Sequence, residues 1–259
     1  MDVSGKVFFI TGGAQGLGKA YAETLLAKGA KIFLGDVDPK AGAETLEDFQ
    51  KRFGEQNVKF TAFDVTDLGK FEAAFQEAVS AFGRVDVMVN NAGIMNEGVW
   101  QKMIQINYTA LVWGTKLATE HMRKDKGGAG GRVINISSVV GLIEFSSAPV
   151  YSGTKHAVRA FTSSMATQPK VAELGVEYGV LCPNAAATDL VLKLDDSKVH
   201  FLDHIKDALA RTTMEIPTVV DAFMQLVQLE NMNGAILWVT KEKTQFTKMK
   251  AEEVESPPS

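Results

Sequence analysis

The stretch "KVFFITGGAQGLGKAYAETLLAKG" (residues 6–29) decides the fold. It begins with a short apolar run, passes through a group of glycines, and continues with helical spacing. The run "KVFFIT" predicts a buried strand, and "GLGKAYAETLLAKG" predicts a helix that ends near Gly29. Glycines at such a turn let a pyrophosphate approach the start of the helix. The stretch therefore predicts a βα unit that binds a dinucleotide.

The spacing of Gly12, Gly16 and Gly18 is wider than the usual G-x-G-x-x-G fingerprint. An ordinary turn between a strand and a helix is the alternative interpretation. The position of the loop, after the first strand of a βα series, favours dinucleotide binding. The residues expected to contact the cofactor in this loop are Gly12, Gln15, Gly16, Leu17 and Gly18.

Further along the chain, short β-rich runs alternate with helical patterns. Strands are expected at 30–36, 58–65, 85–93, 132–138, 175–183 and 234–240, and helices at 39–53, 68–83, 100–124, from about 149, and 217–229. Alternation of this kind predicts a parallel sheet built from βαβ units. We expect one α/β domain over residues 1–245, a doubly wound Rossmann-type sheet with helices on both faces. A less regular lid is expected at about 189–216, and a loose tail at 246–259.

The composition excludes several classes of protein. The chain has 259 residues, of which 46% are hydrophobic and 22% charged, and its net charge is -4. These values fit a soluble globular protein and give no basic surface for nucleic acid. No signal peptide is expected at the N-terminus, and no apolar run is long enough for membrane insertion. The single cysteine, Cys182, excludes an internal disulfide, and we expect a cytoplasmic protein.

Asp36 ends the second predicted strand, 18 residues after Gly18. A carboxylate at that point would accept hydrogen bonds from the adenosine ribose and repel the 2′-phosphate of NADP. Val37 and Asp38 offer no positive charge to that phosphate. Asp36 could instead only begin a turn, but in a dinucleotide fold it predicts NAD as the cofactor.

Tyr151 and Lys155 lie four residues apart in "PVYSGTKHAV" (residues 149–158). On a helix this spacing places both side chains on one face. An ammonium close to a phenol can lower its pKa from about 10 by ~1–3 units. A tyrosine shifted in this way can act as a general acid or base. An ordinary surface pair is the alternative interpretation.

Taken together, the motifs resemble the short-chain dehydrogenase/reductase family over about 240 residues. "TGGAQGLG" is similar to its glycine motif, "NNAG" to the motif that ends its fourth strand, and "YSGTK" to its catalytic pair. More narrowly, "NNAGIMNE", "PVYSGTKH" and "DHIKD" resemble the branch that contains NAD-dependent 15-hydroxyprostaglandin dehydrogenase. The invertebrate alcohol dehydrogenases are a nearby comparison.

The resemblance implies a role for each matching residue. Asn107, Ser138, Tyr151 and Lys155 correspond to the catalytic tetrad, in which Tyr151 moves a proton and Ser138 holds the substrate oxygen. Lys155 would also hold the nicotinamide ribose, and Asn107 a water that links Lys155 to solvent. Further cofactor contacts are implied at Asp64, Val65, Asn91, Ala92, Gly93, Pro183 and Thr188.

Three positions depart from the family pattern. Asn184 follows Pro183 where the family usually has glycine, whose position there needs a conformation that glycine reaches freely. We expect the loop to have adjusted, with the asparagine amide serving the cofactor or the turn; the alternative is a side chain that crowds the nicotinamide ring. Pro169 falls late in the Tyr151 helix, where it should kink or end that helix. Ala148 replaces a glutamine that lies near the substrate hydroxyl in the prostaglandin branch.

The expected reaction is hydride transfer between NAD and a secondary alcohol or ketone. The residues expected to give an apolar substrate pocket are Ile94, Met95, Val140, Leu142, Phe145 and Leu192. Such a pocket suits an apolar or lipid-like substrate, such as a hydroxy fatty acid or prostaglandin. The alternative is a catalytically weak dinucleotide-binding protein with a structural or sensing role, suggested by Asn184 and Pro169.

Two further expectations concern metals and assembly. His200, Asp203 and His204 lack a convincing ligand pattern, so no metal is expected. A homodimer is expected, because the helices that contain Asn107 and Tyr151 pair with their symmetry mates in related enzymes, and twofold dimers are the commonest closed assembly.

Overall fold

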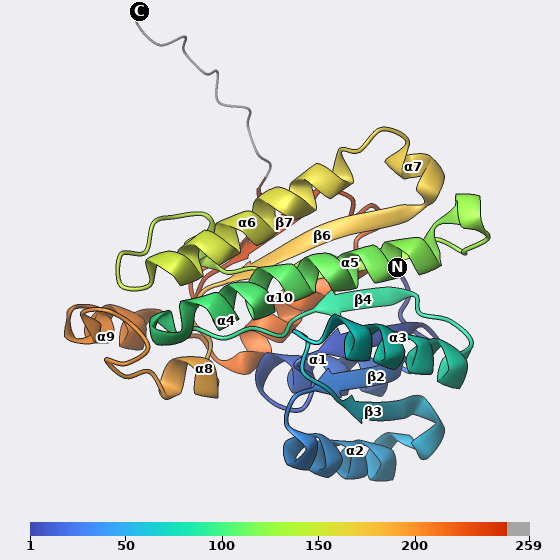
Figure 1. Cartoon of the computed structure of the whole chain (residues 1–259), viewed down its shortest axis with the longest axis horizontal. Helices are drawn as coiled ribbons and strands as arrows, with labels where there is room; N and C mark the ends of the chain where they lie inside the picture. The colour runs from blue at the N-terminus through green and yellow to red at the C-terminus, as the bar shows by residue number, and fades with distance from the viewer. Residues whose placement is uncertain (248–259) are drawn as a thin grey trace, which may run out of the picture.

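A computed structural model describes residues 1–247 of the chain. It contains one sheet in the order β3-β2-β1-β4-β5-β6-β7-β8, covered by helices on both faces (Figure 1). The order reverses between β1 and β4, which is the switch point where doubly wound folds bind their ligands. The predicted α/β Rossmann-type architecture is confirmed.

The seven expected strands are present, parallel to one another, and differ from their expected bounds only at the ends. They are β1 Val7–Thr11, β2 Lys31–Asp36, β3 Val58–Ala62, β4 Val87–Asn90, β5 Gly131–Ile136, β6 Val176–Pro183 and β7 Ala235–Val239. Every residue of β1 and β4 is buried. Strands covered on both faces are continuous apolar runs, and this property made them recognisable in the sequence.

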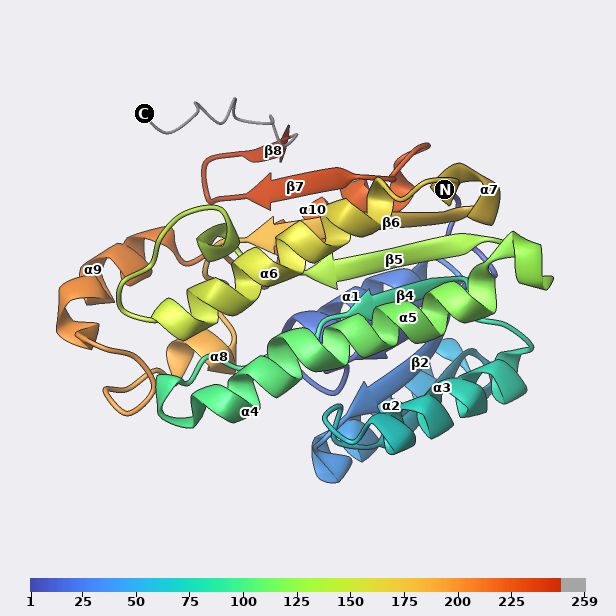
Figure 2. The ribbon, with the colours of Figure 1, turned by 45° about the horizontal axis from the view of Figure 1, so that its top comes forward.

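The helices form two layers (Figures 1 and 2). One layer holds α1 Gly16–Ala27, α2 Pro39–Phe53 and α10 Ile216–Gln228, and the other holds α3 Leu68–Phe82, α5 Leu111–Met122 and α6 Pro149–Ala166. Asp38 caps α2 by accepting the N–H groups of Lys40 and Ala41, and Asp67 caps α3 by accepting that of Lys70. Side chains of this kind supply the partners that a helix lacks at its start.

The expected helix at 100–124 is interrupted. It consists of α4 Trp100–Ile104, a π-helical turn Gln105–Ala110 and α5. Such π turns often occur at functional sites. This one contains Asn107, whose side chain bonds the backbone N–H and C=O of Ile94 at 2.9 and 2.8 Å.

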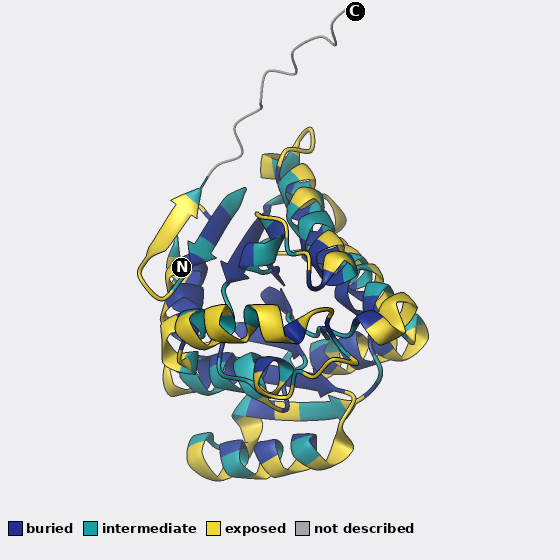
Figure 3. Cartoon of the chain, turned by 90° about the vertical axis from the view of Figure 1, so that its left-hand side faces the viewer, coloured by how far each residue is buried: buried dark blue, intermediate teal, exposed yellow. Residues whose placement is uncertain are grey.

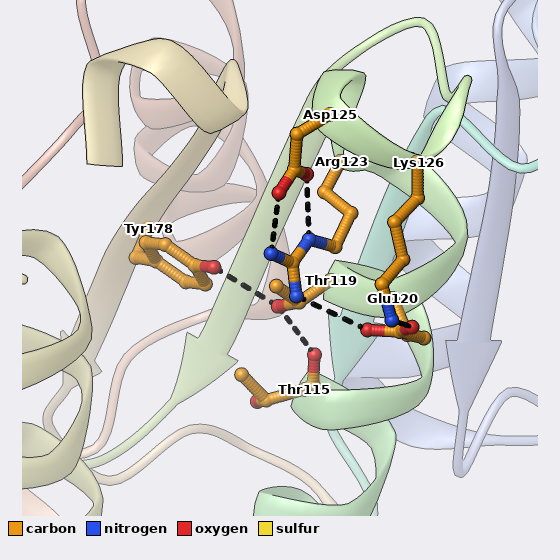
Figure 4. A network of polar contacts seen from close by, with 7 residues as sticks. All are labelled: Thr115, Thr119, Glu120, Arg123, Asp125, Lys126 and Tyr178. Carbon is orange, nitrogen blue, oxygen red and sulfur yellow. Dashed lines mark hydrogen bonds and ion pairs between the residues drawn. The ribbon is translucent and has the colours of Figure 1, made fainter. Parts of the chain in front are cut away.

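The C-terminal end of α5 is joined to β6 (Figure 4). The Thr119 hydroxyl lies 3.0 Å from that of Tyr178 and donates to the Thr115 carbonyl. Arg123 pairs with Asp125 and Glu120 on the exposed side. Exposed ion pairs contribute about 1 kcal/mol or less, so the contact of Thr119 with Tyr178 is the firmer link.

Two expectations about the last third of the chain are wrong. The segment expected to be less regular contains α8 Asp189–Leu192 and α9 Leu202–Thr212. Residues 246 and 247, expected to belong to the tail, instead lie in β8 Thr244–Thr247, which pairs antiparallel with β7. Such a short, exposed edge strand carries little apolar signal. Residues 248–259, the rest of the expected tail, lie outside the described residues.

Pro169 does not interrupt α6. The helix ends at Ala166, three residues earlier, and the short helix α7 Val171–Leu174 follows. The expectation that Pro169 lies within this helix is therefore wrong, because the helix ends before the proline. Residues up to 247 include no helix long and apolar enough to cross a bilayer.

Candidate active site

A cavity of about 1110 Å³ lies at the carboxyl ends of the strands, beside the switch point. Figure 3 looks onto this edge of the molecule, with buried strands in dark blue behind the exposed surface of the outer helices. Its wall includes residues that follow each of the strands β1 to β7, together with the segment 188–216. Loops at the ends of all seven parallel strands therefore meet around one space.

Most of the predicted site residues line this cavity. They are Gly12, Gln15, Gly16, Leu17, Asp36, Asp64, Val65, Asn91, Ala92, Gly93, Ser138, Tyr151, Lys155, Pro183 and Thr188. Gly18 and Asn107 do not line it. Gly18 packs against the glycine loop, and Asn107 is fully buried below Ile94.

The glycine loop is folded for close approach to a ligand. Gly12 and Gly16 have φ of 64° and 56°, a region that favours glycine. The Gln15 side chain makes no capping hydrogen bond at the start of α1. The first amide groups of a helix need outside partners, and an anion supplies them. The loop therefore fits a pyrophosphate.

Asn91 and Thr11 hold this loop against β4. The Asn91 side-chain amide donates to the carbonyls of Thr11 and Gly12, each at 3.0 Å. In return the Thr11 hydroxyl accepts the N–H groups of Asn91 and Ala92. Sequence reasoning gave Thr11 no role, although a threonine directly before the glycines was a visible signal.

The Asp36 carboxylate lies beside the glycine loop, in the wall of the cavity, and is 6% exposed. It accepts the N–H groups of Ala14 and Asp38, at 2.9 and 3.1 Å. Each carboxylate oxygen can accept more than one hydrogen bond, so both remain able to accept ribose hydroxyls. The site fits the adenosine half of a dinucleotide without a 2′-phosphate.

Tyr151 and Lys155 share one face of α6, and the Lys155 ammonium lies 5.6 Å from the centre of the Tyr151 ring. The ammonium also donates to the Ile136 carbonyl at 3.0 Å. Ser138 follows β5 and donates to the Pro183 carbonyl at 3.2 Å. All three side chains reach the same cavity.

The pKa values of this pair differ from the sequence-based expectation. Burial raises the pKa of Tyr151 to about 12, and a hydrogen bond with Ser138 opposes the rise. Burial also lowers the pKa of Lys155 to about 8. In the chain alone, desolvation is therefore the largest influence on both groups. A lower pKa of Tyr151 in the presence of Lys155 and NAD together stays a prediction.

Four of the six expected pocket residues, Ile94, Met95, Val140 and Phe145, line the cavity. The other two do not, because Leu142 packs in a separate cluster and Leu192 is 66% exposed. The lid instead contributes Leu190 and Val191, and from α9 Ile205 and Leu209. Helix periodicity in the lid could have identified these last two. Ala148 is fully buried.

Asn184 does not adopt a glycine-like conformation. Within the described chain, only Lys170 and Phe201 are non-glycine residues with positive φ. The Asn184 backbone N–H donates to Val239, and its side-chain oxygen accepts the N–H of Ala185 at 2.8 Å. The asparagine therefore stabilises its own turn, as expected for a loop that has adjusted to it.

We accordingly expect Asn184→Gly to change cofactor affinity by less than about tenfold, or ~1.4 kcal/mol. The substitution removes one local hydrogen bond, and it should lower the melting temperature slightly. Isothermal titration with NADH and a thermal melt measure the two effects. A gain in affinity well above tenfold would mean that the asparagine crowds the site.

Residues 1–247 contain no group of three or more His, Cys, Asp or Glu side chains that could hold an ion. Lys206 pairs with Asp203 on the exposed side of α9.

Comparison with known proteins gives consistent matches. The profile of the short chain dehydrogenase family matches residues 6–198. Human 15-hydroxyprostaglandin dehydrogenase [NAD(+)] is 36% identical over 249 residues, which is 94% of each chain. Diacetyl reductase [(S)-acetoin forming] of Staphylococcus epidermidis is 34% identical over 221 residues, 82% of this chain and 84% of its own.

Among solved structures, a short chain dehydrogenase/reductase from Burkholderia phymatum in complex with NAD matches with a TM-score of 0.80. It is 23% identical and the match covers 92% of this chain and 90% of the other, so it supports the fold alone. From the family profile and the two relatives, the chain belongs to the short-chain dehydrogenase/reductase family.

Proposed function

We propose that the chain is an NAD-dependent oxidoreductase that interconverts a secondary alcohol and a ketone. One observation carries the proposal: Ser138, Tyr151 and Lys155 line the same cavity as the glycine loop and Asp36. This reaction requires a proton carrier and a dinucleotide site that open into one space. The names of the curated relatives, which include an NAD-dependent dehydrogenase, support it.

In the proposed mechanism, Ser138 hydrogen-bonds the substrate oxygen and Tyr151 accepts the hydroxyl proton. When bound, NAD supplies a positively charged ring that takes the hydride of the carbinol carbon. Tyr151 is buried and its pKa is about 12 without ligand, so a second positive charge beside Lys155 would favour its phenolate. In the reverse direction Tyr151 protonates the carbonyl oxygen.

Asn107 is proposed to assist Lys155 from a position beneath the cavity wall. An ideal Cβ built on Gly93 would lie 3.3 Å from the Asn107 side-chain oxygen and 3.6 Å from the Lys155 nitrogen. Both side chains therefore approach the backbone of Gly93. This proximity supports the role of Asn107 in holding a water beside Lys155.

The substrate is proposed to be apolar or lipid-like, since aliphatic side chains dominate the wall beyond Tyr151. A hydroxy fatty acid or a prostaglandin has that character, and the human relative is named for the latter. A panel of 2-octanol, 12-hydroxyoctadecanoate and 2-butanol, followed by NADH absorbance, tests the proposal. The rate should rise with pH, because oxidation needs the basic form of Tyr151.

The alternative of a catalytically weak dinucleotide-binding protein rested on Asn184 and Pro169. Asn184 is unstrained and Pro169 lies beyond the end of α6. NADH binding without turnover of any alcohol or ketone in the panel would favour that alternative.

Asp36→Ser is expected to relax the cofactor preference toward NADP. The substitution removes a negative charge that repels a 2′-phosphate and two acceptor oxygens for the ribose. The measurement is the ratio of kcat/KM with NAD to that with NADP. A wild-type ratio near one would show that Asp36 does not select the cofactor.

We also propose a cytoplasmic homodimer in which α5 and α6 pair with their symmetry mates. The outer side of α6 carries small residues, and a Cβ at Gly153 would meet nothing within 4 Å. Small residues permit close helix approach. Sedimentation at micromolar concentration should show twice the chain mass of 28.0 kDa, and a species of the chain mass alone would refute the dimer.

A further inference from the structure

Glu97 is a buried carboxylate at the start of α6. It lies in the turn Glu97–Val99 after β4 and is 8% exposed. Its two oxygens accept the N–H groups of Tyr151 at 2.9 Å and Val150 at 3.1 Å. Burial of a carboxylate is costly unless it is hydrogen-bonded. The two hydrogen bonds from the start of α6 offset that cost and hold Glu97 in its buried position.

The amide groups at the start of α6 are completely accounted for. Ala148, the N-cap residue, makes no capping hydrogen bond with its side chain. Pro149 has no N–H, Glu97 binds those of Val150 and Tyr151, and Ser152 donates to Ala148 within the helix at 2.9 Å. The cap of this helix is therefore supplied by a residue more than fifty positions earlier.

The same residue is also in contact with the lid. The backbone N–H of Glu97 donates to the Lys198 carbonyl at 2.8 Å, and the N–H of His200 donates to the Ser147 carbonyl at 2.7 Å. These two bonds connect the segment before α9 to the residues on either side of the cap. The turn that contains Glu97 therefore contacts both the lid and the first turn of α6.

From this geometry we propose that Glu97 is a positioning residue for the reaction of Tyr151. It fixes the backbone of Tyr151, and so the phenol, relative to Ser138 and the lid. The inference rests on the proposed function, since it assigns Tyr151 as the proton carrier. Sequence reasoning gave Glu97 no role.

The charge of Glu97 also bears on Tyr151. Lys155 lies beside the phenol on the same helix, Glu97 contacts the backbone at the start of that helix, and Asp64, Lys102 and Asp189 line the cavity that Tyr151 reaches. Tyr151 also packs among the apolar side chains of Met95, Met103, Ala148, Val199 and Leu202. A carboxylate at a helix start balances the helix dipole and opposes the phenolate. Without it, the pKa of Tyr151 should fall.

Glu97→Gln tests the proposal, because glutamine keeps the size but offers one acceptor oxygen for two N–H groups. We expect kcat with the best alcohol of the panel to fall by about tenfold or more, since small misplacements of reacting groups are costly. The KM for NAD should change by less than about twofold, because Glu97 does not line the cavity. The alkaline rise of kcat should move to lower pH.

Asp67→Asn is the matched control. Asp67 caps α3 through a similar side-chain contact with Lys70 and does not line the cavity. It should lower the melting temperature while kcat and the pH profile stay unchanged. If Glu97→Gln behaves in the same way, the cap is only structural and the proposal is overturned.

Two measurements keep the test decisive if Glu97→Gln folds poorly or no alcohol is turned over. Glu97→Asp keeps the charge on a shorter side chain, so kcat should fall without a shift of the pH profile; an unchanged kcat would contradict the proposal.

Hydrogen exchange at the amides of Val150 and Tyr151 needs no turnover. It should quicken in Glu97→Gln, and unchanged exchange would show that Glu97 does not hold the helix start.

Discussion

Tyr151→Phe is expected to lower kcat by about 10²- to 10⁴-fold, the usual contribution of a general acid or base. Phenylalanine keeps the ring, which packs in the cluster with Met103 and Leu202, and removes only the oxygen that carries the proton. The affinity for NADH should therefore stay nearly unchanged. Steady-state kinetics with the best alcohol of the panel, beside NADH binding by fluorescence, measure both quantities.

Tyr178→Phe is the control for this substitution. It also removes one hydroxyl, but that hydroxyl bonds Thr119 at the far end of α5 and does not reach the cavity (Figure 4). Its kcat should equal that of the wild type. If Tyr151→Phe retains more than about a tenth of wild-type kcat, a different group carries the proton.

Gly18→Ala is expected to have the second large effect, on cofactor binding. A Cβ at this position would collide with the Gly12 carbonyl oxygen and lie 2.7 Å from the Asn91 side-chain nitrogen. Both atoms hold the glycine loop in place, so the loop must move. Overpacking of this kind costs about 1–3 kcal/mol, and we expect the dissociation constant for NADH to rise by about tenfold or more.

Gly69→Ala provides the comparison, since Gly69 lies in the first turn of α3 and a Cβ there would meet only Asp67, at 3.6 Å. It should leave NADH binding unchanged. Calorimetric titration with NADH gives the dissociation constant of each variant. The comparison separates the effect of the collision at Gly18 from a general effect of replacing a helical glycine. Unchanged NADH affinity in Gly18→Ala would mean that the glycine loop does not form the cofactor site.

Much of the fold could be predicted because the central strands are fully buried. A strand such as β1, buried along its whole length, is a continuous apolar run, and the glycine loop after it marks the switch point. The edge strand β8 and helix α9 have weaker signals, since most of their residues are exposed. The π turn at 105–110 has no apolar periodicity of its own and was predicted as ordinary helix.

The candidate site was predictable where one residue type implies one chemistry, as at Asp36 and the Tyr151–Lys155 pair. Two properties were not. The balance between burial and charge that sets the pKa of Tyr151 depends on how deeply α6 packs. The cap supplied by Glu97 joins residues 53 and 54 positions apart, and only the folded chain brings them together.

Transfer of deuterium tests the central claim most directly. The wild-type protein is incubated with NAD and a secondary alcohol of the panel that carries deuterium on its carbinol carbon, and the NADH formed is analysed by mass spectrometry. Hydride transfer from substrate to cofactor predicts NADH heavier by the difference between deuterium and hydrogen, formed by the wild type and scarcely by Tyr151→Phe. NADH binding without any labelled NADH from the whole panel would contradict the account.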